Sequence, residues 1–197
     1  PMLMQVAGNP YKPDTLRHQA WQVIGRIGTL QALTLLASNL MTSWGEPRRW
    51  ILRILLKLSD EQGLRRSADI DIALDGLGRQ SVETLLNQEL QFIGQLYSGL
   101  IDCGADQAPG DTFDWLRRAL QDMQTDAMER MLMLMRFLYP SSTIQAAELS
   151  LEGSASSRAR GLEILDNTLD IPAKRAILTL FEQSSMTATL TALTPLV

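Results

Sequence analysis

The chain offers few side chains that could perform catalysis. His18 is the only histidine and Cys103 the only cysteine. A Ser–His–Asp triad would have to use His18, and no Gly-x-Ser-x-Gly sequence supplies a nucleophile for it. One histidine and one cysteine cannot make the four-ligand site of a structural zinc ion. We therefore expect His18 to face solvent or the rim of a neighbouring helix, and Cys103 to be an inert thiol.

Three carboxylates, Asp69, Asp71 and Asp75, lie close together in the sequence. A calcium-binding EF-hand loop needs alternating oxygen ligands, a central glycine and a distant glutamate. Apolar residues occupy the intervening positions here, so we interpret the three carboxylates as a solvated or capping acidic edge. The adjoining Gly76-Leu77-Gly78 lacks the preceding strand and the third glycine of a dinucleotide-binding loop, and it indicates a helix break.

A run of basic residues is the strongest candidate for a binding surface. Between Arg48 and Arg66 six basic residues stand against two acidic ones, whereas from Asp69 to Glu129 twelve acidic residues stand against three basic ones. Oppositely charged surfaces of this kind are typical of a docking scaffold, although ordinary solvated helix faces give the same pattern. We predict that five residues dock an acidic partner or a membrane surface and contribute little to stability: Arg48, Arg49, Arg53, Lys57 and Trp44.

Composition narrows the class of protein. The net charge of −4 and the pI near 5.0 give no reason to expect nucleic-acid binding. No uncharged apolar run reaches the roughly 18 residues that a membrane span needs, and no leader sequence is recognisable. We expect a cytoplasmic protein without cofactor or small-molecule substrate, which begins at Pro1 as a fragment of a longer polypeptide.

Apolar periodicity predicts helices along the whole chain, and no sustained alternation predicts a strand. Each helix follows a Pro, Gly or capping residue, as at Gly28, Pro47, Pro140 and Gly153. On the first long helix we expect Leu16, Ala20, Val23, Ile24 and Ile27 to point inward. The predicted helices are 15–27, 30–43, 48–59, one or two within 61–77, 81–103, 113–123, 125–139, 141–151, 158–169, 173–182 and 185–193.

The segment Arg158–Glu182 indicates the architecture most clearly, because it reads as two short helices joined by a tight corner. Ser156 or Ser157 would cap the first helix, while Asp170 would cap the second with Pro172 in its first turn. Such pairs cannot bury their apolar stripes alone and imply neighbours of the same kind. We therefore predict an all-α solenoid of the HEAT or armadillo type, with about nine or ten helices. Residues 1–60 would form HEAT-like repeats and residues 61–197 a continuing solenoid, both within one structural unit.

Two stretches of sequence also resemble the C-terminal helical region of bacterial and cyanobacterial HEAT-repeat proteins. The first is ERMLMLMRFLYP, ending at Pro140, and the second is RARGLEILDNTLDIPAKRAILTLFE, which departs from the usual pattern at Gly161 and Thr168. The matching positions are Glu129, Arg130, Leu138, Tyr139, Pro140, Arg158, Ala159, Leu162, Glu163, Leu165, Asp166, Asn167, Leu169, Lys174, Arg175 and Glu182. Weaker similarity extends over about residues 45–183.

The resemblance implies a scaffold and brings no catalytic residues. In that family such a region accompanies a membrane domain similar to nucleotide translocases, or a cyclic-nucleotide-binding domain, and this chain contains neither. We expect a non-catalytic helical scaffold that binds a protein partner or regulates one. The alternative is a cytoplasmic module of a nucleotide-translocase-like transporter, tethered at the membrane face by a region outside this chain. An enzyme similar to the HEAT-like chromophore lyases is the weakest alternative, because reactive side chains are missing.

Overall fold

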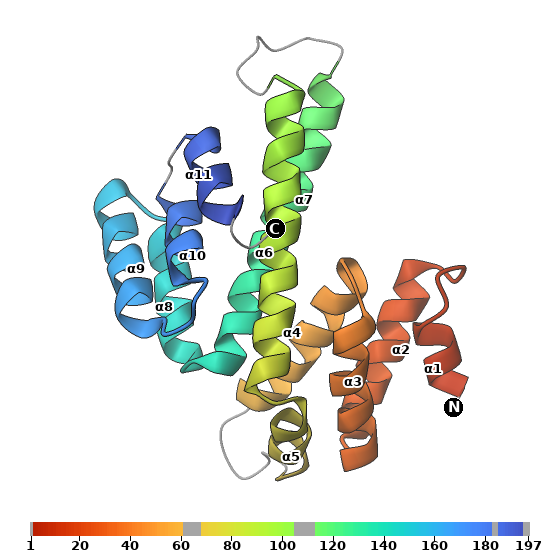
Figure 1. The fold of residues 1–197 in the computed structure, drawn as a ribbon. Coiled ribbons are helices and arrows are strands. Elements are labelled where there is room, and N and C mark those ends of the chain that lie inside the picture. Colours follow the sequence, from red (N-terminus) through yellow and green to blue (C-terminus); the bar gives the residue numbers. More distant parts are fainter. Residues whose placement is uncertain (1, 61–67, 105–112, 183–184, 195–197) are drawn as a thin grey trace. The chain divides into compact units, whose positions relative to one another are not determined.

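The computed structural model describes residues 2–60, 68–104, 113–182 and 185–194, which form helices joined by short turns. Within these ranges there are eleven α-helices and no strand (Figure 1). The predicted all-α class is therefore confirmed. The sequence also predicts a loop over Gly104–Gly110 and a helix cap at Asp111; apart from Gly104, these residues lie outside the described ranges.

The chain divides into two compact units, residues 1–83 and 84–197. The division falls between Glu83 and Thr84, inside the first turns of the long helix α6 (Arg79–Asp102). Each unit has its own set of packed helices.

Unit 1 contains five helices before α6. They are α1 (Met2–Ala7), α2 (Asp14–Ile27), α3 (Leu30–Thr42), α4 (Glu46–Asp60) and α5 (Ala68–Leu77). Helix α1 packs on α2; α2, α3 and α4 all pack on one another, and α5 packs on α3 and α4. Contacts thus join both successive helices and helices two apart in the chain, α2 with α4 and α3 with α5.

The turn between α2 and α3 forms as the sequence predicts. Gly28 ends α2 in the left-handed region with φ of 64°, which a residue without a Cβ adopts at little cost. Thr29 then caps α3, because its side-chain oxygen accepts a hydrogen bond from the Ala32 amide. Periodicity predicts that Leu33, Leu36, Leu40 and Met41 of α3 point inward; the three leucines are buried and Met41 is half-buried.

The predicted inner face of α2 is wrong at three of its five positions. Leu16, Val23 and Ile27 are 43%, 41% and 52% exposed, whereas Ala20 and Ile24 are buried as predicted. The buried face is centred on Trp21, which is 1% exposed, and continues through Ile24 and Gly25. The large indole ring therefore fixes which side of α2 faces the core, and the stripe through Leu16, Val23 and Ile27 lies beside that face.

Unit 2 is built around a helical hairpin. Helix α7 (Asp114–Leu138) runs antiparallel to α6, since contacts between them progress in opposite directions along the two helices. Those contacts are Cys103–Arg117, Gly99–Leu120, Tyr97–Gln124 and Glu89–Arg130. The two helices predicted for 113–123 and 125–139 are one helix, because no Pro or Gly interrupts 114–138.

Four short helices complete unit 2: α8 (Ser141–Leu151), α9 (Ala155–Thr168), α10 (Lys174–Phe181) and α11 (Met186–Leu193). Each packs on its neighbour in sequence, and the most extensive contact is between α8 and α9 (Figure 1). Gly161 makes that contact close: a Cβ there would lie 3.0 Å from the Ala147 carbonyl oxygen and from Leu151 Cγ. Leu165 of α9 is completely buried.

Two predicted caps in this region are wrong. Helix α9 begins earlier than expected, and Ser154 caps it by accepting a hydrogen bond from the Ser157 amide. Asp170 does not cap α10; its carboxylate instead accepts a 2.7 Å hydrogen bond from the Tyr139 hydroxyl. The same hydroxyl accepts a hydrogen bond from the Asp170 amide at 3.2 Å. Asp170 thus fastens the corner between α9 and α10 to the end of α7.

Candidate functional site

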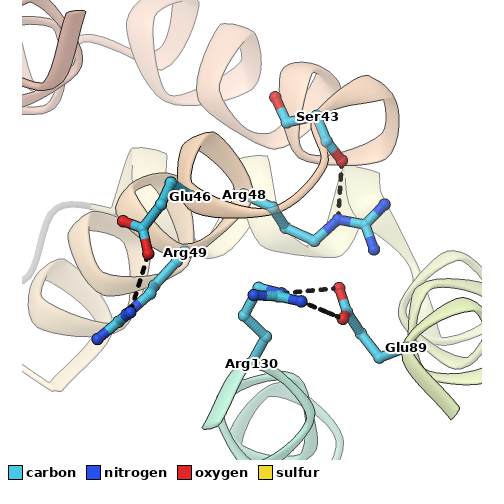
Figure 2. Close-up of polar contacts among 6 residues, drawn as sticks. All are labelled: Ser43, Glu46, Arg48, Arg49, Glu89 and Arg130. Atoms are coloured by element: carbon cyan, nitrogen blue, oxygen red, sulfur yellow. Dashed lines mark hydrogen bonds and ion pairs between the residues drawn. The ribbon is translucent and has the colours of Figure 1, made fainter. Parts of the chain in front are cut away.

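Arg48 does not lie on the outer face of α4, so this part of the predicted basic surface is wrong. Its side chain is 1% exposed, and its Nε donates a 2.8 Å hydrogen bond to the Ser43 carbonyl oxygen (Figure 2). Its guanidinium carbon lies 4.6 Å from the ring centroid of Trp44, which is itself 44% exposed. Helical spacing explains the burial, because Arg48 shares a face with the buried Leu52 and Leu55, four and seven residues further on. Arg48 therefore joins the start of α4 to the end of α3.

Arg49 follows Arg48 in the sequence, but its side chain pairs with a residue in the first turn of α4. Its Nη1 is 2.9 Å from Glu46 Oε1, three residues earlier, and its side chain is 20% exposed (Figure 2). An ion pair between residues three apart stabilises a helix by only about 0.2–0.5 kcal/mol. A partner that binds Arg49 would therefore have to compete with Glu46.

Arg53 and Lys57 are exposed as predicted, and together with α2 they form the edge of a cavity. The cavity holds about 400 Å³. We call it the α2–α4 hollow; the described residues that line it are His18, Gln22, Gly25, Arg26, Trp50, Arg53, Ile54, Lys57 and Leu58. Lys57 lies four residues after Arg53, so the two side chains project from the same face of α4.

Arg26 is the site residue that sequence reasoning missed. It lies on α2, is exposed, and lines the same hollow as Arg53 and Lys57. Within the described part of the chain, neither Arg26 nor Lys57 makes an ion pair, and none of the lining residues is acidic. The packing of α2 on α4 produces this convergence, and a sequence scan for local charge runs does not detect it.

A stacked aromatic pair forms one wall of the hollow. The rings of His18 and Trp50 lie 5.1 Å apart, with 13° between their planes. Gln22 holds the imidazole through a 3.2 Å contact between its Nε2 and His18 Nε2. The Arg17 guanidinium lies 5.7 Å from the Trp50 ring, while Arg17 also pairs with Asp14 at 2.9 Å. His18 is therefore half-buried against a neighbouring helix, which is one of the two positions that the sequence predicts for it.

Gly25 of α2 lies directly against the Ile54 side chain of α4. A Cβ on Gly25 would lie 2.5 Å from Ile54 Cγ2, so the branched Ile54 side chain or one of the two helices would have to shift. Gly25 thus lets α2 and α4 come together, and the longer side chains of Arg26, Arg53 and Lys57 then stand around the contact. The chemistry offered is that of binding: cations and an imidazole, with no hydroxyl, thiol or carboxylate among the described lining residues.

The other candidate residues do not assemble a reactive site. Cys103 is half-buried at the end of α6, where its carbonyl oxygen accepts a 3.1 Å hydrogen bond from Arg117. Asp69, Asp71 and Asp75 all lie on helix α5 and not in a loop. Over the residues that the structure describes, no three His, Cys, Asp or Glu side chains are grouped to hold a metal ion.

Unit 2 contains a polar contact of a different kind, a buried ion pair between α6 and α7. Arg130 is 3% exposed and Glu89 is 0% exposed. Arg130 Nη2 donates to Glu89 Oε2 at 2.9 Å, and its Nε lies 3.1 Å from both carboxylate oxygens (Figure 2). The sequence resemblance included Arg130, but local sequence gave no sign of a partner 41 residues away.

Unit 2 also has an acidic groove of about 470 Å³. Its described lining comprises Thr125, Met128, Glu129, Leu132, Glu148, Leu151, Glu152 and Phe181. Burial raises the pKa of Glu148 above its ordinary value of 4.5; the charge of Arg136 opposes this, and the charges of Glu152 and Glu129 add to it. The groove thus repels further negative charge, in contrast with the α2–α4 hollow.

Among the described helices, none combines the length and the apolar character required to cross a bilayer. No protein-family model, curated protein or solved structure matches the chain.

Proposed function

We propose that the protein is a non-catalytic helical scaffold that binds an acidic protein partner through the α2–α4 hollow. The observation that carries the proposal is the convergence of Arg26, Arg53 and Lys57, from two helices, around one cavity. Clustered cations attract an acidic surface and steer its approach, which is the usual contribution of charge to association.

The charge balance of the chain supports this assignment to unit 1. Residues 1–83 contain ten basic and eight acidic residues, whereas residues 84–197 contain eight basic and fourteen acidic residues. Trp50 and the arginines around it are also of the residue types that contribute most binding energy at protein interfaces.

The packing of unit 1 supports a HEAT-like solenoid as the architecture of the scaffold. In stacked helical pairs each helix contacts its partner and also the equivalent helix of the next pair. The contacts of α2 with α4 and of α3 with α5 follow that pattern. In such a stack the α2–α4 hollow would lie between equivalent helices of successive repeats, on a surface that repeat proteins use for binding.

Binding of a fluorescent poly-glutamate peptide, followed by anisotropy, tests the proposed function. We expect saturable binding that weakens with salt, and a loss of about tenfold or more in affinity for the double variant Arg53→Glu/Lys57→Glu. Arg160→Glu is the matched control, because Arg160 is an exposed arginine on α9. The Arg160→Glu variant should bind the poly-glutamate peptide with nearly the same affinity as the wild type.

Folding is checked in the same preparation by thermal melting. Arg53 and Lys57 are exposed, so their reversal should move Tm by no more than about one or two degrees. Equal peptide affinity for the wild type and the double variant would refute the proposed function. Loss of folding in the double variant would show that these two residues are structural, and would refute it as well.

A further inference from the structure

The α2–α4 hollow combines three features that together specify a ligand chemistry. Positive charge comes from Arg26 on one helix and from Arg53 and Lys57 on the other. The walls between these charges are apolar, at Ile54 and Leu58. The volume of about 400 Å³ is larger than a bare anion needs.

We infer that the hollow recognises a phosphorylated side chain on a segment of the acidic partner; this inference rests on the proposed function. A phosphomonoester carries a charge of about −1.5 to −2 at pH 7 and three acceptor oxygens. A single carboxylate offers one charge and two oxygens, so it can contact fewer of the three cations at once. Arginine clusters are the usual means by which proteins recognise phosphorylated segments.

The positions of the cations favour a peptide over a small phosphorylated metabolite. Sites for small molecules enclose about 70–90% of the ligand surface. Here Arg26, Arg53 and Lys57 are all exposed at the edge of the hollow, so a ligand would be gripped from one side. An extended segment can lie across such an edge, placing its phosphate between the cations and its flanking residues against Ile54 and Leu58.

The polar groups next to the cations suit the same ligand. His18 is fixed against Trp50 and hydrogen-bonded with Gln22, so its ring is already oriented where it lines the hollow. Ordered side chains lose less entropy on binding than free ones, which improves affinity. Because the His18 and Trp50 rings line the hollow, a phosphate bound there would change their NMR chemical shifts.

The test compares three short peptide pools with identical random flanking residues and a central phosphoserine, glutamate or serine. Binding to the full chain is measured by anisotropy at physiological salt. We expect the phosphoserine pool to bind about tenfold more tightly than the glutamate pool, and the serine pool to bind least. Equal affinity for the phosphoserine and glutamate pools would overturn the inference while leaving the proposed function in place. Absence of binding to every pool would overturn both.

Two further arms identify the source of the phosphate. Free phosphoserine and inorganic phosphate should bind much more weakly than the peptide pool; equal binding would assign the hollow to small phosphorylated compounds and overturn the peptide assignment. Vesicles containing phosphatidic acid should not compete with the peptide. Competition at low lipid concentration would assign the hollow to a membrane surface and overturn the inference.

Variants locate the site. Arg26→Gln and Lys57→Gln remove one charge each from opposite helices, and each should reduce the preference for phosphoserine over glutamate, while Arg160→Gln should not. Two-dimensional NMR of the wild type provides a readout that does not depend on variants. Shifts on adding the phosphoserine pool should be centred on the Trp50 indole and His18 signals, and shifts confined to other residues would overturn the inference.

Discussion

Arg130 and Glu89 form a bidentate ion pair in which both side chains are removed from water, at 3% and 0% exposure. Two charges in such a place are stable only while they neutralise each other, because desolvation of either one alone is costly. We predict that Glu89→Ala lowers the free energy of unfolding by about 3–5 kcal/mol, as measured by urea denaturation.

A double variant distinguishes the destabilisation caused by an unpaired buried charge from the net contribution of the ion pair to stability. In Glu89→Leu/Arg130→Met both charges are replaced by apolar groups, and we expect most of the lost stability to return. The control is Glu83→Ala on the same helix, where the pair with Arg79 is 2.6 Å long but 32% and 50% exposed. That change should cost less than about 1 kcal/mol. A double variant as unstable as Glu89→Ala would contradict this account.

Leu165 and Glu163 lie two residues apart on α9 and differ in burial. Leu165 is 0% exposed, whereas Glu163 is exposed. Leu165→Ala should leave a cavity and lower the free energy of unfolding by roughly 2–5 kcal/mol, while Glu163→Ala should change it by under about 0.5 kcal/mol. The two changes act on the same helix, which packs chiefly on α8. Equal melting temperatures would show that α9 does not bury the Leu165 face.

Two glycines in helices of unit 2 should respond in opposite ways to alanine. At Gly161 the added Cβ would meet the Ala147 carbonyl oxygen and Leu151 at 3.0 Å, so α8 and α9 must separate and stability should fall by about 1–3 kcal/mol. At Gly99 the nearest atom would be Leu120 Cδ1 at 3.5 Å, an ordinary contact. Gly99→Ala should therefore stabilise the protein by up to about 1 kcal/mol through helix propensity. Thermal melts of both variants check the contrast; a stabilised Gly161→Ala would refute the close contact.

Glu148 should make stability depend on pH. Because burial raises the pKa of Glu148 in the folded chain, the folded state holds this proton more tightly than the unfolded state. Its contribution to stability is therefore greatest at low pH and declines as pH rises above the ordinary value of 4.5. We expect Glu148→Gln to raise Tm relative to the wild type at pH 7 and to lose that advantage near pH 4. An advantage of the same size at both pH values would be inconsistent with this cause.

The sequence was most informative where one helix face is uniformly apolar. Helical periodicity predicts that eight apolar residues of α6 point inward, and all eight are buried: Val82, Leu85, Leu86, Leu90, Ile93, Leu96, Tyr97 and Leu100. On α2 two apolar stripes compete, and periodicity favoured the one containing Leu16, Val23 and Ile27. Trp21 and the close contact at Gly25 determine which face of α2 is buried. Both depend on tertiary packing, which apolar periodicity does not detect.

In the candidate site, too, the sequence indicates residues that are neighbours on one helix but not residues that are brought together by packing of two helices. Arg53 and Lys57 were found because they are neighbours on one helix. Arg26 was missed because it reaches the hollow only through packing of α2 on α4. Arg48 was misplaced because charge suggested an outer position, whereas its helical position lies on the buried face.

The core of α7 has a further consequence for the chemical durability of the fold. Five successive residues, Met131 to Met135, are all buried, and three of them are methionines. Oxidation turns a thioether into a polar sulfoxide that this apolar surrounding could not solvate. Met2 and Met123, which are 79% and 44% exposed, should react with peroxide first and harmlessly. Sulfoxide at Met131, Met133 or Met135 would then show that the core of unit 2 had opened to solvent.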